Sequence, residues 1–407
     1  MTLDPWYVTL APAFQRLDAW IENEGFRGWD PYDALNSPLL RRLTFGSRRL
    51  GQLWVQLFKL SPVNLRPLFG VPKGYNPKGM GLFLASYWRK YLLGGEARHL
   101  QQTRFFARWL LDNHSKGFHG LSWGYNFPWP NRGFFAPAGM PTIVNTAFIG
   151  LAFLDLIRLE GTSSSPGQPT DWGFSPLETA RAACEFILLD LNRTEPAADE
   201  LCFSYTPLDH RFVHNANLMG AWLLAETAAL TGEDPLIDAA ARAARYTVRR
   251  QGADGSWKYG EGPGDGWVDN FHTGFVLTAL KRILELRPEA GPGESLEWGY
   301  LYWKRVFSLP NGAPKYFPQK TWPIDIHACA QSALTFLAFS DQDSQAQDLA
   351  RRSLDWAMER MQDRGGFFYF QRRPAWTIRI PYLRWSQAWM QRAFVELEWR
   401  AARIARQ

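Results

Sequence analysis

The first feature of this sequence is an alternation between strongly apolar segments and amphipathic ones. The apolar segments are rich in small residues and have the length of ordinary helices. Six of them can be recognised: 81–91, 146–159, 216–230, 271–286, 326–338 and 385–397. A helix that is apolar on every side has to be surrounded by other protein, so these segments predict inner helices of a large core.

The segments between them have charged residues on one side only. They cover roughly 101–112, 177–191, 235–249, 296–306 and 346–361. In the third of these, Ala240 and Ala244 fall on one helical face and Arg242 and Arg249 on another. Each repeating unit is therefore expected to pair an apolar helix with an amphipathic one that covers it.

Five of the apolar helices are preceded by a polar marker residue. The marker stands five positions before a Gly or Ala, and successive markers are 69, 70, 54 and 56 residues apart. The markers are Asn76, Asn145, Asn215, Asp269 and Asp325. A sixth equivalent position falls near Arg384, 59 residues further on, without an Asn or Asp. Since Asn and Asp are favoured N-caps, the markers are expected to cap the inner helices, which would gather them and their loops at one end of the ring. Either each serves only as a cap, or together they form part of a site.

A short extended piece recurs between the two helices of a unit. It reads Trp123-Gly-Tyr125, Phe203-Ser-Tyr205, Trp257-Lys-Tyr259, Pro314-Lys-Tyr316 and Phe367-Phe-Tyr369. In three units the Tyr precedes the next marker by nine or ten residues. The aromatic pieces and the markers are thus expected to gather at one end.

These repeats predict an all-α fold, an (α/α)6 toroid of six helical hairpins with short extended segments at one end. A hairpin of this kind cannot bury both of its apolar faces alone, whereas six in a ring can. We expect a single domain over residues 1–407, in which residues 1–60 complete the ring and 50–60 form the first outer helix. The Pro- and Gly-containing stretches 61–77 and 161–174 are expected to be loops within this domain.

The pattern resembles the toroids of six-hairpin glycosidases, polysaccharide lyases and terpenoid cyclases. The segment from Gln251 to Trp257, QGADGSW, is similar to the QW repeat of terpene cyclases. The segments 28–37 and 123–130 resemble those of uncharacterised bacterial proteins associated with polysaccharide, including exopolysaccharide, biosynthesis. This resemblance implies the fold and a polysaccharide context, but the fold hosts many chemistries.

Composition narrows the class of partner. The 407 residues carry a formal net charge of +6, and 20 of them are Trp, a side chain suited to stacking on a flat ligand face. The basic residues are dispersed, and the densest groups are Arg41-Arg42, Arg48-Arg49 and Arg249-Arg250. No long basic run favours a nucleic-acid partner, so we expect none, and we expect a polysaccharide or oligosaccharide substrate that is acidic.

Further features indicate where the protein acts. The three cysteines are far apart in sequence and form no CxxC pair, as is typical of reduced thiols. No basic-apolar leader and no apolar run of about 18 residues is present, so we expect a cytoplasmic protein without a transmembrane segment. We expect no cofactor and no metal, and the oligomeric state is left open.

The candidate catalytic residues are the acids, histidines and tyrosines near the markers. They are Asp269, Asp325, His272, His214, Tyr205 and Tyr259. The candidate substrate-binding residues are aromatic, amide and charged side chains in the same region. They are Trp123, Tyr125, Asn145, Asn215, Asn217, Trp257, Trp267, Asn270, Tyr316, Trp322, His327, Arg384, Trp385, Gln387, Asp30 and Asp33.

Two kinds of carbohydrate chemistry fit these residues. Glycosidic-bond hydrolysis needs two carboxylates, which Asp269 and Asp325 could supply from the same register in adjacent units. A uronate lyase or C5-epimerase instead needs a Tyr or His base and a partner that neutralises a carboxylate, roles for which Tyr259, His272 and Arg384 are suited. We give hydrolysis as the first prediction and the lyase or epimerase as its alternative.

Three other classes remain open at this point. A non-catalytic glycan-binding protein would keep the Trp residues without needing the acids. A terpenoid cyclase-like enzyme is favoured only by the fold, since neither DxDD nor DDxxD occurs. A metal held by His214, His272 and His327 lacks any HExxH or similarly close spacing.

Overall fold

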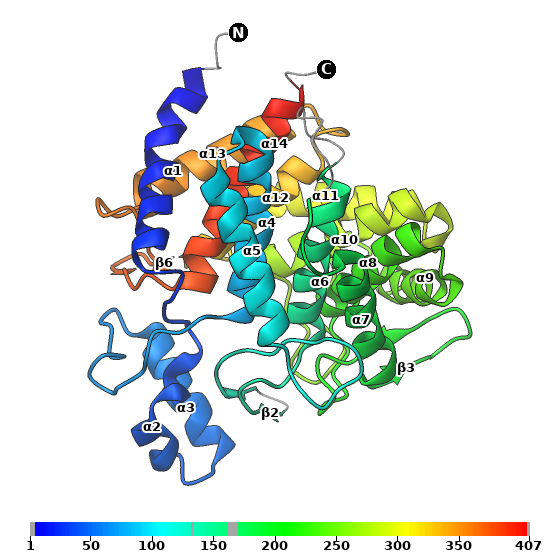
Figure 1. Ribbon diagram of the computed structural model, residues 1–407, viewed down its shortest axis with the longest axis horizontal. Helices are drawn as coiled ribbons and strands as arrows, with labels where there is room; N and C mark the ends of the chain where they lie inside the picture. Colours follow the sequence, from blue (N-terminus) through cyan, green and yellow to red (C-terminus); the bar gives the residue numbers. More distant parts are fainter. Residues whose placement is uncertain (1–4, 132–133, 161–169, 405–407) are drawn as a thin grey trace. The chain divides into compact units, whose positions relative to one another are not determined.

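The computed structural model describes residues 5–131, 134–160 and 170–404, which are mainly helical (Figure 1). The chain forms two compact units. Unit 1 comprises Met1–Met80, Asn126–Ala138 and Phe307–Gln407, and unit 2 comprises Gly81–Tyr125 and Gly139–Val306. Whether the chain folds as a single domain stays a prediction, and each unit is described by itself.

Unit 2 is built on three apolar helices that pack side by side. They are α6 (Ile143–Arg158), α8 (His214–Thr231) and α10 (Asn270–Leu286), and α8 lies against both of the others. The amphipathic helices α7 (Pro176–Leu189) and α9 (Asp234–Val248) cover α6 and α8 (Figure 1). Two further amphipathic helices are α5 (Ala97–Asp112) and α11 (Gly293–Phe307). The last residue of α11 belongs to unit 1. The predicted helices are confirmed here to within a few residues.

The glycines that follow the markers explain why the repeat contains a small residue. A Cβ at Gly81 would lie 2.8 Å from Ile149, and one at Gly150 would lie 2.7 Å from Leu223. A Cβ at Gly220 would lie 2.5 Å from Ile143. These distances are too short for a methyl group, so the glycines allow neighbouring apolar helices to approach closely.

Unit 1 holds the last apolar helices of the chain. Here α12 (Ile326–Ala338) packs against α13 (Ala346–Met361) and against α14 (Trp389–Ile404), which continues the π-helical turn η4 (Leu383–Ala388). The apolar helix α4 (Pro77–Gly94) begins in unit 1 and ends in unit 2. The remaining helical pieces are η1 (Asp33–Asn36), α2 (Pro38–Leu43), α3 (Arg48–Leu60) and η3 (Pro288–Ala290).

The outer partner of α14 is α1 (Pro5–Asn23), which corrects one expectation. The helix expected at 50–60 exists as α3, but it packs on η1, α2 and β1, whereas α1 packs on α14 and η4. The side chain of Gln362, after α13, donates to the carbonyl of Ala13 on α1 over 2.8 Å. The sequence pattern of α3 resembles that of an outer helix because α3 is the more strongly amphipathic of the two.

A glycine in the loop after an outer helix touches the backbone of the next outer helix. Cβ atoms at Gly120, Gly255, Gly312 and Gly366 would lie 2.0–2.7 Å from the carbonyl oxygens of Ala182, Trp298, Arg352 and Arg16 respectively. The first three of these carbonyls belong to α7, α11 and α13, and the fourth belongs to α1. The position of α1 therefore repeats that of the other outer helices.

The loops hold very short antiparallel sheets, and of the repeated extended pieces only Phe203 lies in one of their strands. In unit 1, β1 (Trp129–Pro130) pairs with β2 (Phe135–Ala136), and β6 (Gln371–Arg372) lies between β5 (Ile324–Asp325) and β7 (Thr377–Ile378). In unit 2, β3 (Arg193–Thr194) pairs with β4 (Cys202–Phe203). The carbonyl of Tyr205 accepts from the backbone of Ile143, and that of Tyr259 accepts from His214. The repeated tyrosines are thus tied to the starts of α6 and α8.

The markers divide into caps and residues of the first helical turn. Asn76, Asp269 and Asp325 accept backbone N–H groups at the starts of α4, α10 and α12. Asn145 and Asn215 do not cap their helices, contrary to the capping expectation. Thr142 caps α6 in place of Asn145, and α8 begins one residue before Asn215. Both amide side chains are therefore left without a capping role.

Two general findings complete the fold. No helix among the described residues is both long enough and apolar enough to cross a membrane. Cys184, Cys202 and Cys329 are buried and unpaired, as their sequence spacing indicated.

Candidate functional site

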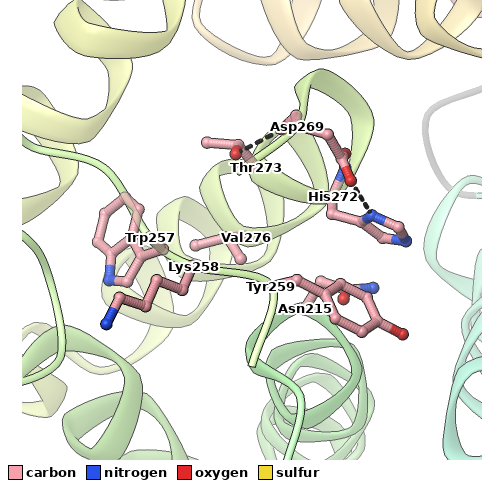
Figure 2. A pocket seen from close by; sticks show the side chains of 8 residues that line it. All are labelled: Asn215, Trp257, Lys258, Tyr259, Asp269, His272, Thr273 and Val276. Carbon is pink, nitrogen blue, oxygen red and sulfur yellow. Dashed lines mark hydrogen bonds and ion pairs between the residues drawn. The ribbon is translucent and has the colours of Figure 1, made fainter. Parts of the chain in front are cut away.

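A small pocket lies in unit 2 where α8, α10 and the third extended piece meet (Figure 2). Its empty space, open solvent at the mouth included, is about 200 Å³, so it is a shallow hollow. Eight residues line it: Asn215, Trp257, Lys258, Tyr259, Asp269, His272, Thr273 and Val276. Five of these were candidates from the sequence, and all eight belong to the same compact unit.

Asp269 and His272 form a hydrogen-bonded dyad at the start of α10. Oδ1 of Asp269 accepts the backbone N–H of His272 over 3.0 Å, which caps the helix. Oδ2 contacts Nδ1 of His272 at 2.6 Å, and it also accepts the indole N–H of Trp267 over 2.9 Å. Asp269 is 2% exposed, and these contacts fix both its carboxyl group and the orientation of the imidazole.

The second nitrogen of His272 is available for chemistry. Figure 2 shows Nε2 directed away from Asp269, and no hydrogen bond to it is found among the described residues. The side chain of His272 is 24% exposed, so a ligand in the pocket can reach it. A His held at Nδ1 by a carboxylate and open at Nε2 has the arrangement of a general acid or base.

Tyr259 forms the aromatic wall beside this dyad. Its ring stacks on Trp267 at 4.3 Å and lies 4.6 Å from the ring of His272. Burial, opposed by Arg211, raises the pKa of Tyr259, and the carboxylates of Asp265 and Asp269 add to the increase. The phenol therefore stays protonated at neutral pH and can donate a hydrogen bond to a developing oxyanion.

Two amides at neighbouring helix starts have unpaired polar atoms. Oδ1 of Asn215, in a residue that is 4% exposed, has no hydrogen-bond partner among the described residues. The same holds for both polar side-chain atoms of Asn145, which is fully buried. A buried amide without a partner costs free energy, so a site that leaves Asn215 unpaired is suited to binding hydroxyl groups.

Several other sequence candidates of unit 2 are engaged in packing. Trp123 and Trp257 are almost completely buried, and their indoles donate to the carbonyls of Leu110 and Thr247. The side chain of Asn217 accepts the backbone N–H of Phe203 and donates to the carbonyl of Ala243. The backbone carbonyl of Asn270 accepts the indole N–H of Trp303. Among these residues only Trp257 also borders the pocket.

His214 differs from His272 in having both ring nitrogens occupied. Nε2 lies 2.8 Å from Glu261, and Nδ1 lies 3.4 Å from Thr247. The side chain is 1% exposed, so the structure places it as a buried anchor of α8. Tyr205 is 8% exposed and precedes this helix, and neither residue borders the pocket. Tyr125 lies near enough to Tyr259 to raise the pKa of Tyr259 slightly, so Tyr125 is close to the pocket.

Most of the remaining candidates lie in unit 1, in a dense buried network. Asp30 accepts two hydrogen bonds from Arg384 at 2.6 and 2.9 Å, and Asp33 is paired with Arg66 at 2.6 Å. Arg384 marks the sixth repeat position, and its guanidinium is bound there by Asp30 from near the N-terminus. These ion pairs satisfy one another, which is typical of a structural network.

Asp325 belongs to the same unit, and no described cationic side chain lies within hydrogen-bond reach of it. It accepts from the indole of Trp385 over 2.9 Å and from Gln371 over 3.1 Å, and burial raises its pKa to about 6. The ring of His327 lies 4.7 Å from that of Trp385. Gln387 is fully buried and bonds both backbone polar groups of Phe368.

Tyr316 and Trp322 are partly exposed, and the ring of Tyr316 contacts Phe317. They lie in unit 1 on the loop before β5 and do not border the pocket of unit 2.

Three residues that line the pocket were not candidates from the sequence: Lys258, Thr273 and Val276. Thr273 and Val276 follow Asp269 by four and seven positions, so a helical-face argument from the marker could have found them. Lys258 is the central residue of the extended piece, and no pattern distinguished it. In the described part of the chain, no group of three or more His, Cys, Asp or Glu residues is arranged to hold a metal ion.

Comparison with known proteins gives a structural match but no sequence match. No protein-family model matches the chain, and no curated protein matches it. A cellobiose 2-epimerase from Bacillus thermoamylovorans superposes with a TM-score of 0.59 at 12% identity, over 80% of this chain and 90% of that one. A D-mannose isomerase superposes with a TM-score of 0.57 at 12% identity, over 79% and 87%. An unsaturated glucuronyl hydrolase specific for heparin gives a TM-score of 0.58 at 12% identity, over 84% and 90%.

These three proteins share one architecture, built from six helical hairpins. The chain has the (α/α)6 toroid fold. This confirms the fold predicted from the repeat. At 12% identity the likeness reaches the fold alone, so the chemistry has to be argued from the site.

Proposed function

We propose that this chain is an enzyme that acts on a sugar by moving a proton at a carbon next to a carbonyl or carboxylate, as an epimerase or isomerase does. The observation that carries the proposal is the pocket around His272, whose Nδ1 is bound by Asp269 and whose Nε2 is open. Structural neighbours named as a cellobiose 2-epimerase and a D-mannose isomerase support the choice of a sugar substrate.

The geometry suggests a role for each pocket residue. His272 removes the proton through Nε2, and Asp269 stabilises the imidazolium that forms. Tyr259 donates a hydrogen bond to the oxygen that becomes an enolate, since its raised pKa keeps the phenol protonated. Asn215 accepts a hydroxyl hydrogen through its unpaired Oδ1. Return of this proton from His272 to the neighbouring carbon gives an isomer. An epimer forms when the enediolate rotates in the pocket and His272 returns the proton to its opposite face.

Glycosidic-bond hydrolysis, the first prediction from sequence, has less support from this pocket. A hydrolase needs one carboxyl group that can donate a proton and a second that acts as base or nucleophile. Asp269 is held by three donors, and the nearby Asp265 is paired with Arg211. Neither carboxylate is free to take these roles, so we do not carry hydrolysis into the proposal.

The test is a comparison of two His-to-Asn variants on a panel of reducing sugars and uronates. His272→Asn should lower turnover by about 10²–10⁴-fold because the general base is lost. His119→Asn is the matched control, since His119 also contacts an Asp, Asp190 at 3.0 Å, but at a 64% exposed position. It should leave turnover unchanged.

Products would be identified by NMR, which separates epimers and isomers from hydrolysis products. Equal turnover by His272→Asn and wild-type protein on an accepted sugar would sink the proposed role of His272. Release of reducing ends without a change of configuration would restore hydrolysis as the activity.

A further inference from the structure

The exposed apolar side chains of this protein are concentrated on one short part of unit 1. Among the described residues, nine of the seventeen large apolar side chains that are exposed lie between positions 39 and 68. They sit on α2, on the turn after it, on α3 and on the following loop, and α2 and α3 pack together (Figure 1). A cluster of exposed apolar side chains of this kind usually marks an interaction surface.

Helix α3 is apolar on two faces, and only one of them is covered. Val55 and Phe58 are buried in a small core with Leu35 and Leu40. On another face, Leu50, Leu53, Leu57 and Leu60 are 38–62% exposed. Their spacing of three, four and three residues places them in one stripe along the helix.

The turn between α2 and α3 holds an exposed aromatic residue, Phe45, in a strained backbone conformation. Phe45 is 84% exposed and has a φ of 48°, in the left-handed region where glycine is favoured. A bulky side chain at such a position gains nothing from packing and strains the backbone. Its presence there indicates that the ring contacts something outside the fold.

The surroundings of this apolar stripe are basic. Arg41 and Arg42 on α2, and Arg48 and Arg49 in the first turn of α3, are all exposed. No Asp or Glu occurs in the sequence between Asp33 and Glu96. Exposed leucines and arginines on one pair of helices, without acidic residues nearby in sequence, are typical of an element that lies in the interface of an anionic membrane.

We propose that α2, α3 and the turn between them form a docking surface for an anionic lipid bilayer. The leucine stripe and Phe45 enter the boundary between head groups and acyl chains, and the four arginines contact the anionic head groups. Since no described helix can cross a membrane, the attachment is to the bilayer surface. This inference does not depend on the reaction proposed for the pocket.

The experiment is vesicle flotation with the full chain. We expect binding to vesicles that contain phosphatidylserine, weaker binding at high salt, and little binding to phosphatidylcholine alone. The double change Leu53→Glu with Leu57→Glu should abolish binding. Leu301→Glu, at a similarly exposed leucine of α11, is the control and should have no effect.

The charged and aromatic parts are tested separately. Changing Arg48 and Arg49 to Ala should weaken binding by about thirtyfold, about fivefold per charge. The control changes Arg104 and Arg108, two exposed arginines of α5, and should alter binding little. Phe45→Gly should weaken binding while leaving the melting temperature unchanged or higher, since glycine relieves the backbone strain.

The proposal would be overturned if the Leu53/Leu57 double variant bound vesicles as well as the wild-type protein does. It would also be overturned if the wild-type protein bound both kinds of vesicle equally. Absence of vesicle binding would overturn the proposal as well. This includes the case in which sedimentation shows that the protein instead self-associates through this surface. Circular dichroism of each variant excludes unfolding as the cause of lost binding.

Discussion

At the scale of single residues, Asp269 connects the fold to the chemistry. One of its oxygens caps α10, and the other holds Nδ1 of His272. The residue that sets the helix start therefore also sets the direction of Nε2. This explains how a capping position recognised in the sequence can belong to the candidate site.

The two roles of Asp269 can be separated by substitution. Asp269→Asn should change the free energy of unfolding little, since Asn is as good an N-cap as Asp. It should nevertheless lower turnover by about 10²-fold or more, because the imidazolium loses its anionic partner. Asp269→Ala should lose both activity and about 1 kcal/mol of stability. Denaturant unfolding and turnover, measured on the same preparations, check both expectations.

Asp325 predicts a pH dependence of stability. Burial raises its pKa from 3.8 to about 6, so between these values the folded state binds more protons than the unfolded state. Stability should therefore fall as pH rises through this window, by an amount on the order of 3 kcal/mol. Asp325→Asn should flatten this part of the profile, whereas Asp341→Asn, at an exposed position, should not. An unchanged slope in Asp325→Asn would contradict the assignment.

The roles of individual side chains were the hardest part to predict from the sequence. Trp257 and Trp267 are both Trp residues near a marker, yet Trp257 is buried while Trp267 stacks on Tyr259. His214 and His272 both stand in the first turn of an apolar helix, yet only His272 has an open nitrogen. These differences depend on the path of the loops, which hydrophobic periodicity does not record.

At the scale of elements, the loop glycines join each outer helix to the next. Gly366 has a φ of 102°, and a Cβ there would lie 2.2 Å from the carbonyl oxygen of Arg16. This contact assigns α1 to the outer position next to α14. The element order was predictable because helix pairs alternate so regularly, while the place of α1 was not, since α1 is less amphipathic than α3.

Substitution of this glycine tests the position of α1. Gly366→Ala should destabilise the protein by about 3 kcal/mol, through backbone strain and the clash with α1. Gly365→Ala, one residue earlier, should cost less, since its nearest neighbour would be the side chain of Asp363 at 3.2 Å. Urea unfolding of the two variants gives the comparison, and equal losses would argue against the packing of this loop on α1.

At the scale of the whole molecule, the repeat specifies the fold but not the reaction. The repeat predicted a toroid because six self-similar units can bury their apolar faces only by packing against one another. The same fold occurs in proteins named as an epimerase, an isomerase and a hydrolase. The fold therefore leaves the reaction open, and the dyad of Asp269 and His272 carries the argument for proton transfer.

The measurement that tests this central claim most directly is exchange of sugar carbon-bound hydrogen with heavy water, followed by NMR. With wild-type protein and an accepted sugar, deuterium should appear at the carbon next to the carbonyl or carboxylate. With His272→Asn this incorporation should fall by about 10²-fold or more. Turnover without any incorporation of deuterium, or incorporation unaffected by loss of His272, would contradict the proposed mechanism.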